Sequence, residues 1–365
     1  MDKKKGVVKT KKIWFKVFLI VVCILLSVIV GYVIYVYVSY DRIEDNQPLA
    51  IEGNAEHTEI RQNTEYTAVS YNIGFGAYTP DFTFFMDGGT QSWAKSEESV
   101  ISCIENDITL LQNQKADMIF LQEVDFDSTR SYHVNEVEKI RNSSDKISSS
   151  LAVNYHSAFL FYPLWQPHGS SNAGILTISN IQIMSGIRRS LPILEGFSKF
   201  IDLDRCYAVN RIAVEDGKEL ILINVHLSAY GTDGNLQQQQ IDKLFGDMRN
   251  EYNKGNYVIC AGDFNHDFLG NSVEVFNKKV PEEYNWAKPF PDERIPEHFR
   301  KVDDYPNAKT VPSCRNCDKP YDENCFTLTV DGFIVSDNVN ITYANIIDNQ
   351  FAYSDHNPVI IKFKV

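Results

Sequence analysis

The sequence is short of positive charge outside its first residues. It contains 35 Lys and Arg residues against 48 Asp and Glu residues, a formal net charge of −13 at pH 7. Residues 1–40 hold seven of the lysines and one aspartate, which leaves 28 basic and 47 acidic residues and a net charge of −19 for the remainder. A protein that binds nucleic acid without specialised contacts needs a basic surface, so this composition argues against that role. A bound cation would still let a local site accept a phosphate.

Residues 17–40, VFLIVVCILLSVIVGYVIYVYVSY, lack any charged residue. At about 1.5 Å per residue, a helix of this length crosses a hydrocarbon core of roughly 30 Å. The stretch is too long for a typical signal-peptide core, and no clean cleavage site of small residues follows it. Four tyrosines suit the far interface: Tyr32, Tyr35, Tyr37 and Tyr40.

The lysines before this stretch set the expected orientation. Because positive residues stay on the cytoplasmic side, we predict a cytoplasmic basic tail over 1–16 and a single transmembrane helix over 17–40. The polar, aperiodic residues 41–64 predict a tether. Residues 65–365 then form a catalytic domain outside the cell membrane.

The rest of the chain shows no internal repeat, and strands and helices follow one another. Runs of β-branched and aromatic residues predict strands at 66–73, 116–124, 155–162, 173–179, 207–215, 219–227, 257–262, 327–335 and 358–364. Apolar residues at helical spacing predict helices over 95–114 and 234–253. Helices among many strands indicate an α/β fold in which two packed sheets are covered by helices. The segment 285–322, rich in Pro, Asp and Lys, is interpreted as a long insertion near the active face.

Seven cysteines leave the redox compartment open. Cys314, Cys317 and Cys325 lie close together in the sequence, and they allow either one disulfide with a thiol left over or an incomplete zinc site. A structural zinc ion needs four ligands, so we expect the disulfide outside the membrane.

Polar residues gather where the predicted strands end or begin. They are Asn72, Glu123, His226, Asp263, Asn265, Asp331, Asp355 and His356. Each alone could be a helix cap or a turn residue, but loops on a rigid scaffold are also where catalytic groups concentrate. The set holds carboxylates, amides and two histidines, without an arrangement typical of a serine or cysteine nucleophile. It suits metal-assisted attack of water on a phosphate ester.

Six motifs in chain order carry a family resemblance: SYNIG, FLQEVD, NVHLSAYG, AGDFNHD, VDGFIVS and YSDHNP. Together they are similar to those of the endonuclease/exonuclease/phosphatase superfamily, whose members resemble deoxyribonuclease I. The resemblance covers about residues 66–365. It implies a four-layer α/β sandwich, with two packed mixed sheets flanked by helices. It also implies Mg²⁺-dependent hydrolysis of phosphodiesters or phosphomonoesters, with Mn²⁺ or Ca²⁺ as replacements.

The resemblance also implies a metal site. Asn72 and Glu123 would hold the ion and Asp355 would assist, which agrees with the preference of Mg²⁺ for oxygen ligands. Some family members carry an acidic residue where this chain has Gly74, so a second metal site is doubtful.

Five further residues take catalytic roles by the same resemblance. Asp263 would activate or align the attacking water, and Asn265 would orient the water or the phosphate. Asp331 would bond to His356 and favour its protonated form, so that His356 acts as a base or as a phosphate clamp. His226 would donate to a non-bridging phosphate oxygen.

Three nearby residues have no assigned role. His266 and Asp267 match nothing specific, and we expect them to be exposed. Arg205 either reaches a substrate phosphate or pairs with Asp202 or Asp204.

The substrate is less defined than the reaction. The motif LQEVD resembles the sphingomyelinase and phosphatase branches more than the abasic-site endonucleases. Apolar residues that could form a rim for a lipid, or simply pack as loops, are Phe82, Phe84, Phe85, Met86, Tyr162, Pro163, Leu164 and Trp165.

We predict a membrane-anchored, extracytoplasmic, Mg²⁺-dependent phosphoesterase, whose substrate is a lipid head group, an inositol phosphate or nucleic acid. An extracellular nuclease and a non-catalytic surface binding protein with the same fold are the alternatives. No protein partner is predicted.

Overall fold

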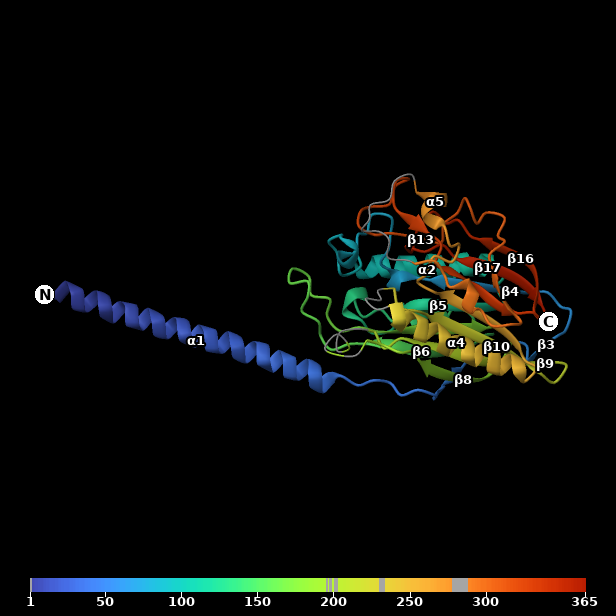
Figure 1. The fold of residues 1–365 in the computed structure, drawn as a ribbon, viewed down its shortest axis with the longest axis horizontal. Coiled ribbons are helices and arrows are strands. Elements are labelled where there is room, and N and C mark those ends of the chain that lie inside the picture. The colour runs from blue at the N-terminus through green and yellow to red at the C-terminus, as the bar shows by residue number, and fades with distance from the viewer. Residues whose placement is uncertain (1, 195, 197–198, 200–202, 230–233, 278–287) are drawn as a thin grey trace.

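The computed structural model describes the whole chain except residues 1, 195, 197–198, 200–202, 230–233 and 278–287. Helix α1 (Asp2–Ser39) projects away from a layered domain that holds the rest of the chain (Figure 1). Within it, Lys12–Ser39 is long and apolar enough to cross a membrane, and the most apolar part is not buried against the protein. The helix therefore fits a membrane anchor.

Two mixed β-sheets form the centre of the domain. In order, the first sheet contains β1 (Gln47–Leu49), β8 (Ile183–Ser190), β9 (Cys206–Val214), β10 (Glu219–His226), β11 (Tyr257–Asp263), β15 (Asp331–Ser336) and β12 (Phe299–Val302), with β3 (Glu59–Ile60) beside β9. The second contains β16 (Asn340–Ile346), β17 (Val359–Lys364), β4 (Tyr66–Asn72), β5 (Met118–Asp125), β7 (Asn172–Ser179), β6 (Ser148–His156) and β2 (Ile51–Glu52). Strands β13 (Cys314–Arg315) and β14 (Thr327–Leu328) form a separate pair.

Each large sheet has a parallel pair of strands near its centre. Strands β4 and β5 are joined by helix α2 (Glu97–Asn113), and β10 and β11 by helix α4 (Gly234–Asn253). Parallel neighbours require such a crossover, and the crossover places their carboxyl ends at the same edge of the sheet. The other helical segments among the described residues are short: α3 (Glu136–Arg141), α5 (Ser272–Phe276), η1 (Gly74–Gly76), η2 (Phe85–Asp87), η3 (Thr129–Ser131) and η6 (Asp292–Arg294).

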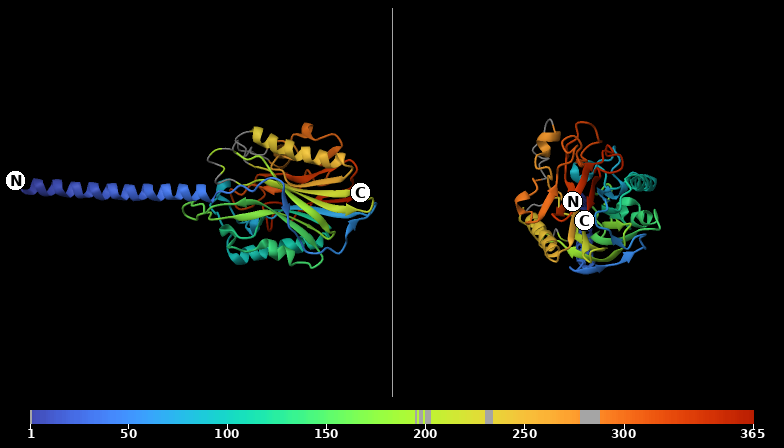
Figure 2. Two further views of the ribbon diagram at one scale, coloured as in Figure 1. Left: turned by 90° about the horizontal axis from the view of Figure 1, so that it is seen from below. Right: turned by 90° about the vertical axis from the view of Figure 1, so that its right-hand side faces the viewer.

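The sheets pack face to face, with α4 outside the first sheet and α2 and α3 outside the second (Figure 2). Side chains alternate along each strand between the inner and outer layers. Phe120 joins the core between the sheets, whereas the next residue, Leu121, packs with the α2 side. Leu222 and Ile223 divide in the same way between the inner core and the α4 side. These three cores make the predicted four-layer α/β sandwich, which the structure confirms.

The predicted tether is wrong over much of its length. Strands β1, β2 and β3 lie within residues 47–60 and pair with β8, β6 and β9. Even before β1, the Ile43 amide donates to Asp204 Oδ2 at 2.7 Å. These strands are only two or three residues long, so they leave no periodic pattern in the sequence.

Several strand boundaries also differ from the predictions. The strand expected at 155–162 runs earlier, as β6, and the one at 327–335 divides into β14 and β15. Strands β8, β12 and β16 were not predicted. Serines open β6, and glycine and arginines occupy β8, so neither has the apolar run by which a strand is recognised.

The predicted disulfide is absent from the three clustered cysteines. Cys314, Cys317 and Cys325 are free, buried thiols. Cys317 Sγ lies 3.9 Å from Asp355 Oδ2, and Cys325 Sγ accepts from the Asp322 amide at 3.2 Å. Cys314 Sγ and Cys317 Sγ share the Arg315 carbonyl oxygen as a neighbour, at 3.6 and 3.9 Å, whereas Cys325 Sγ lies 3.5 Å from the Pro320 carbonyl oxygen. The sequence spacing did not reveal this separation of Cys325 from the other two.

Candidate active site

Strand register brings three of the predicted residues to one end of the first sheet. His226 is the register partner of Asp263, and Asp263 is the partner of Asp331. The parallel strands β10 and β11 end here, and the antiparallel strand β15 begins here. Paired positions on adjacent strands project their side chains to the same face, so the three groups form a row.

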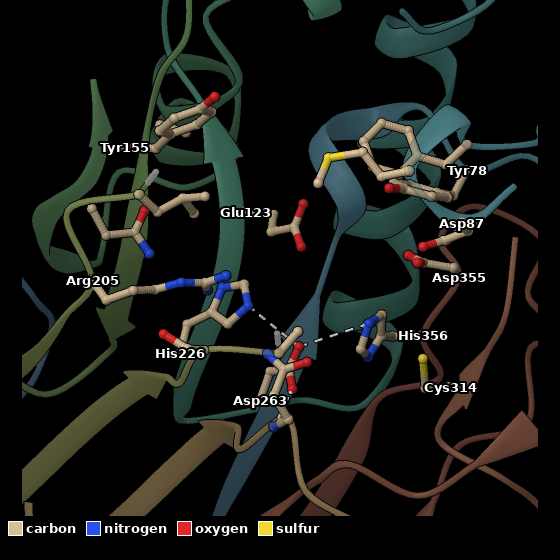
Figure 3. Close-up of a pocket in the computed structure, with 18 of the residues that line it drawn as sticks. Tyr78, Asp87, Glu123, Tyr155, Arg205, His226, Asp263, Cys314, Asp355 and His356 are labelled. Carbon is tan, nitrogen blue, oxygen red and sulfur yellow. Dashed lines mark hydrogen bonds and ion pairs between the residues drawn. The ribbon is translucent and has the colours of Figure 1, made fainter. Parts of the chain in front are cut away.

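The second sheet contributes Asn72 and Glu123 at the same edge. Asn72 ends β4, opposite Gln122 of β5. The pairing of β5 with β7 shifts between Leu121 and Val124, which is a β-bulge, and Glu123 has a φ of 55°. Bulges re-aim side chains, and this one directs the Glu123 carboxylate into the cavity (Figure 3).

A loop before β17 brings in Asp355 and His356. The Ser354 hydroxyl donates to the Asn72 carbonyl at 2.7 Å and accepts from the His356 amide at 3.1 Å. Ser354 is fully buried, so these bonds fix the loop against the end of β4.

A buried polar contact joins the two sheets beneath the site. Gln122 Nε2 donates to Asn224 Oδ1 at 2.8 Å, and Asn224 Nδ2 donates to the Leu121 carbonyl at 3.2 Å. Neither amide side chain is exposed. A polar pair inside an apolar core is stable only when its partners are correctly aligned, so this contact fixes the relative position of the two sheets.

His356 is held by Asp331. Its Nδ1 lies 2.8 Å from Asp331 Oδ2, which also accepts from the Ser313 hydroxyl at 2.7 Å. Burial opposes the charged imidazole, but the Asp331 carboxylate raises the pKa of His356 well above its usual value. His356 is therefore the charged histidine of the site at neutral pH.

Asp263 lies at the centre of the residues that converge here. Its Oδ2 accepts from Asn72 Nδ2 at 3.1 Å, and it lies 3.5 Å from His226 Nε2 and 3.8 Å from His356 Nε2 (Figure 3). Its Oδ1 accepts from the Asn265 amide at 2.9 Å. The potential ligand atoms of Asp263, Asp331 and His356 all lie within 4.8 Å of one another, so this group is one candidate place for a cation.

Burial has opposite consequences for Asp263 and His226. Burial and the Asp331 carboxylate raise the pKa of Asp263 to about 7, although His356 opposes the shift. Burial, Arg205 and His356 lower the pKa of His226 well below its usual value, so this imidazole is neutral. A carboxyl with a pKa near 7 can accept and release a proton at neutral pH.

Glycine and a left-handed residue shape the turn that presents Asp263. Gly262 has a φ of 152°, and a Cβ there would lie 1.9 Å from the Val225 carbonyl oxygen. Asn265 has a φ of 49°, and its Nδ2 donates to the Leu227 carbonyl at 2.8 Å. The Gly-Asp-Phe-Asn stretch is therefore both a specialised turn and the element that delivers the central carboxylate.

Three further carboxylates line the cavity beside the group around Asp263. Glu123, Asp355 and Asp87 all line it (Figure 3). Burial raises the pKa of Asp355 to about 6, with His356 opposing and Glu123 adding to the shift. Burial and the same three carboxylates raise the pKa of Tyr78 well above its usual value. Such a concentration of carboxylate oxygens fits a divalent cation of the kind that prefers oxygen ligands.

Asp87 was missed by the sequence predictions. It closes η2, a three-residue segment without a strand before it. The Phe84 amide donates to the Cys317 carbonyl at 2.8 Å, a bond between segments far apart in the chain that fixes the start of η2. No local pattern signals such a contact.

The Asn72 side chain makes three hydrogen bonds in the site. Its Nδ2 donates to Glu123 Oε1 at 3.2 Å as well as to Asp263, and its Oδ1 accepts from the Gly74 amide at 3.0 Å. Asn72 thus links two carboxylates at the edge of the sheets where the metal site is predicted. At Gly74, φ is 54° and a Cβ would lie 2.5 Å from the Tyr78 ring, so an acidic side chain does not fit.

Arginines supply positive charge to the cavity wall. Arg205 is 8% exposed and extends toward His226 (Figure 3). Of its two expected ion-pair partners, Asp204 pairs with Arg42 and Arg188, and Asp202 lies outside the described residues.

Two further arginines line the cavity and have structural partners. Arg130 forms a two-pronged pair with Asp125, with bonds of 3.0 and 2.8 Å. Arg315 donates through Nη2 to the Thr79 carbonyl at 3.1 Å. Both guanidinium groups are buried, so they fix the walls of the site.

His266 and Asp267 are buried, contrary to the prediction. His266 Nδ1 lies 2.7 Å from the Phe264 carbonyl oxygen, and Asp267 accepts from the Ser272 hydroxyl at 2.6 Å. The Phe290 amide also donates to the Asp267 carbonyl at 2.9 Å, which brings a distant segment over this loop. These residues shape the loop behind Asp263.

Solved structures with the same fold are similar to this chain at low sequence identity. An endonuclease/exonuclease/phosphatase from Beutenbergia cavernae DSM 12333 is 13% identical, with a TM-score of 0.54 over 82% of this chain and 72% of that one. The human Nocturnin catalytic domain with a bound sulfate anion is 15% identical, with a TM-score of 0.51 over 87% and 97%. A humanized D. rerio TDP2 is 12% identical, with a TM-score of 0.52 over 82% and 99%. These likenesses establish the fold.

No curated protein matches the sequence. The model of the Endonuclease/Exonuclease/phosphatase family matches residues 69–356, a span that includes all eight predicted site residues. This match confirms the predicted enzyme class, a metal-dependent phosphoric ester hydrolase. The chain belongs to the Endonuclease/Exonuclease/phosphatase family.

Proposed function

We propose that this chain is a membrane-anchored, extracytoplasmic phosphoesterase that uses Mg²⁺ to hydrolyse a phosphodiester or phosphomonoester. The observation that carries the proposal is the convergence of the His356–Asp331 pair, the buried Asp263 and the facing carboxylates on one cavity. Asp331, Asp263 and Glu123 come from three different strands, and Asp355 and His356 come from one loop. Together these groups provide the charges that ester hydrolysis by water requires.

Glu123 and Asp355 would hold the ion, with Asp87 beside them and Asn72 orienting Glu123 through its amide. When bound, Mg²⁺ would offset the three carboxylates and polarise a phosphoryl oxygen. This ligand set contains only oxygen, as Mg²⁺ prefers, and it leaves room for water and substrate.

Asp263 would take the proton of the attacking water. Its pKa of about 7 lets it be ionised before the reaction and protonated afterwards. Asn72 donates to its Oδ2, which fixes the accepting atom in the cavity. Asn265 supports the opposite oxygen through its backbone amide.

His356 would act as a phosphate clamp. The Asp331 carboxylate keeps the imidazole charged, so its Nε2 is an N–H donor at neutral pH and has no lone pair with which to act as a base. Neutral His226 would donate one further hydrogen bond, and Arg205 would add positive charge on the same side. Fixed donors aimed at a phosphoryl oxygen stabilise the charge that grows in the transition state.

The membrane part of the proposal is supported by α1 and by the lysines that precede its apolar stretch. Mean hydropathy along Lys12–Ser39 suits a membrane span, and the positive-inside rule would leave the domain outside the cytoplasm.

The proposed reaction is tested with the full chain in mild detergent. Bis-(p-nitrophenyl) phosphate, p-nitrophenyl phosphate and plasmid DNA are offered in parallel with Mg²⁺ to the wild type and to His356→Ala. The matched control is His298→Ala, because His298 has the same pairing with an aspartate but at the surface. We expect Mg²⁺-dependent release of p-nitrophenol that only His356→Ala loses.

Three results would contradict the proposal. Equal losses in the two variants would separate the reaction from this site. A folded protein that turns over none of these esters would favour a non-catalytic binding protein, and turnover of DNA alone would favour a nuclease.

A further inference from the structure

Exposed apolar side chains are concentrated beside the mouth of the cavity. Outside α1, the described residues include seven exposed large apolar side chains. Five of them form what we call the apolar rim: Met86, Phe161, Tyr162, Leu164 and Trp165. Leu164 is 82% exposed and Trp165 is 67% exposed. A gathering of this kind indicates a surface that another apolar phase covers.

The apolar rim is continuous with the cavity wall. Met86 lines the cavity itself, as does the neighbouring Phe84. The Phe85 ring packs edge-on against Tyr162, with centroids 5.8 Å apart, and it lies 6.1 Å from the ring of His168, which also lines the cavity. A ligand that enters past the apolar rim therefore reaches the catalytic groups.

The loop 157–171 between β6 and β7, which carries all of the apolar rim except Met86, contacts helix α1. The Tyr32 hydroxyl donates to the Phe159 carbonyl at 3.1 Å, and the Phe159 amide donates to the Tyr35 hydroxyl at 3.1 Å. The rings of Tyr32 and Phe161 pack edge-on at 5.0 Å. Figures 1 and 2 both show this loop, drawn in green, on the side of the domain from which α1 leaves.

These contacts set the depth of the apolar rim relative to a bilayer. Tyr32 follows Lys16, the last charged residue before the apolar stretch, by 16 residues. That spacing is about 24 Å along a helix, which is shorter than the hydrocarbon core of roughly 30 Å. If α1 spans the membrane with Lys16 at its inner boundary, Tyr32 and the Phe161 ring that contacts it lie just inside the outer boundary of the acyl chains.

We propose that the apolar rim inserts into the outer membrane interface and that the site hydrolyses the phosphate ester in a lipid head group of that leaflet. This inference rests on the proposed function. In the reaction, an oxygen–phosphorus bond forms from water while the ester oxygen–phosphorus bond breaks. Asp263 takes the proton of the attacking water and later releases it to solvent, and the leaving oxygen takes a proton from solvent water.

The side chains of the apolar rim suit this environment. Tyr and Trp prefer the interface because their rings are apolar while the phenol and indole groups donate hydrogen bonds. Outside residues 1–40 the chain carries a net charge of −19, so general electrostatic attraction to anionic lipid is not available to hold the domain down. Apolar contact is the remaining means of orienting the cavity toward the leaflet.

Insertion is tested with the full chain in phosphatidylcholine nanodiscs, some of which contain brominated acyl chains. The tryptophan fluorescence of Trp165→Phe is subtracted from that of the wild type, which gives the emission of Trp165 alone. We expect bromine to remove most of that emission. A tryptophan introduced by Tyr343→Trp on β16, an edge strand far from α1, is the control and should be unaffected. If brominated acyl chains quenched neither Trp165 nor the tryptophan of Tyr343→Trp, the proposed insertion would be overturned.

The substrate class is tested in nanodiscs of phosphatidylcholine, sphingomyelin or phosphatidylinositol, with bis-(p-nitrophenyl) phosphate assayed alongside. Leu164→Glu should lower lipid hydrolysis at least about tenfold, because a leucine side chain that inserts into the membrane interface is replaced by a charge. Its hydrolysis of the soluble diester should not change, since Leu164 does not line the cavity. Tyr343→Glu should affect neither activity.

The two proposals fail in different ways. Absence of soluble-diester hydrolysis in the wild type would contradict the proposed function. Normal diester hydrolysis with no cleavage of any of the three lipids, or with no effect of Leu164→Glu on lipid cleavage, would overturn the lipid substrate alone.

Discussion

His356 and Asp331 form a buried pair in which Nδ1 of the imidazole lies 2.8 Å from Oδ2 of the carboxylate. On the other side of Asp263, the buried Nδ1 of His226 has no hydrogen-bond partner among the described residues. One histidine is therefore charged and the other neutral, although both approach the same Asp263 oxygen. Environments that push pKa values apart in this way assign different roles to like residues.

Removing the Asp331 charge should slow catalysis with little effect on substrate binding. We expect Asp331→Asn to lower kcat by about 100-fold or more, because the charged donor on His356 is lost. The pKa of His356 should also fall, since Asp331 is the largest factor that raises it. Steady-state kinetics over a pH series check both effects.

The protein contains a matched control for this change. His298 Nδ1 also lies 2.8 Å from an aspartate oxygen, that of Asp337, but this pair is exposed and away from the cavity. Asp337→Asn should leave kcat unchanged. Similar losses in the two variants would show that Asp331 acts through general stability.

Metal binding should be visible in thermal stability. We expect Mg²⁺ to raise the Tm of the wild type by several degrees, since ligand at about 100 times its Kd stabilises by roughly 2.7 kcal/mol. Glu123→Gln should lose that increase without a lower Tm in chelator, because one of three facing carboxylates has been neutralised. Differential scanning fluorimetry measures both values, with the exposed Glu138→Gln as control. An undiminished Mg²⁺ effect in Glu123→Gln would remove this residue from the metal site.

The turn before Asp263 should not tolerate a side chain. Gly262→Ala places a Cβ 1.9 Å from the Val225 carbonyl oxygen at a φ of 152°, so we expect about 3 kcal/mol or more of destabilisation. In Gly246→Ala the new Cβ meets no atom within 4 Å inside helix α4, and this variant should gain up to about 1 kcal/mol. Thermal unfolding compares them. A Gly262→Ala variant as stable as the wild type would contradict the geometry of this turn.

Acid should weaken the fold partly through Glu251. Burial raises its pKa, but bonds from Arg211, Lys254 and Asn256 prevail and lower it to about 2. Because the folded pKa lies below the unfolded value of about 4.5, the contribution is complete above that value and is lost as pH falls toward 2. Glu251→Gln should cost about 1–2 kcal/mol at pH 7, after allowance for partial exposure, and almost nothing near pH 2.

The measurement for Glu251 is the difference in Tm between the wild type and Glu251→Gln from pH 7 to pH 2. The difference isolates this residue from other groups that titrate in the same range. A difference that stays constant over that range would show that the interaction does not depend on the charge of Glu251.

Much of the site was predictable because regular strands position it. Asn72, His226 and Asp263 end strands of the two parallel pairs, and Asp331 begins an antiparallel neighbour. Motifs at strand ends therefore identify groups that meet at one edge. The same logic explains why the layered fold followed from the order of strands and helices.

The remaining features depend on contacts between segments that are distant in the chain. Asp87 reaches the cavity through a bond between Phe84 and Cys317, and His266 is buried by its own turn and by the segment around Phe290. The orientation of the Asn72 amide depends on the Gly74 amide and on Glu123. None of these relationships has a period or a spacing that a single sequence displays.

Metal dependence of the reaction is tested by a chelation and restoration experiment on the full chain, with bis-(p-nitrophenyl) phosphate as substrate. We expect a chelator to stop the release of p-nitrophenol, and we expect Mg²⁺ to restore the release in the wild type but not in Glu123→Gln. Release that continues in chelator, or that Mg²⁺ restores equally in both proteins, would contradict metal-dependent hydrolysis at this site.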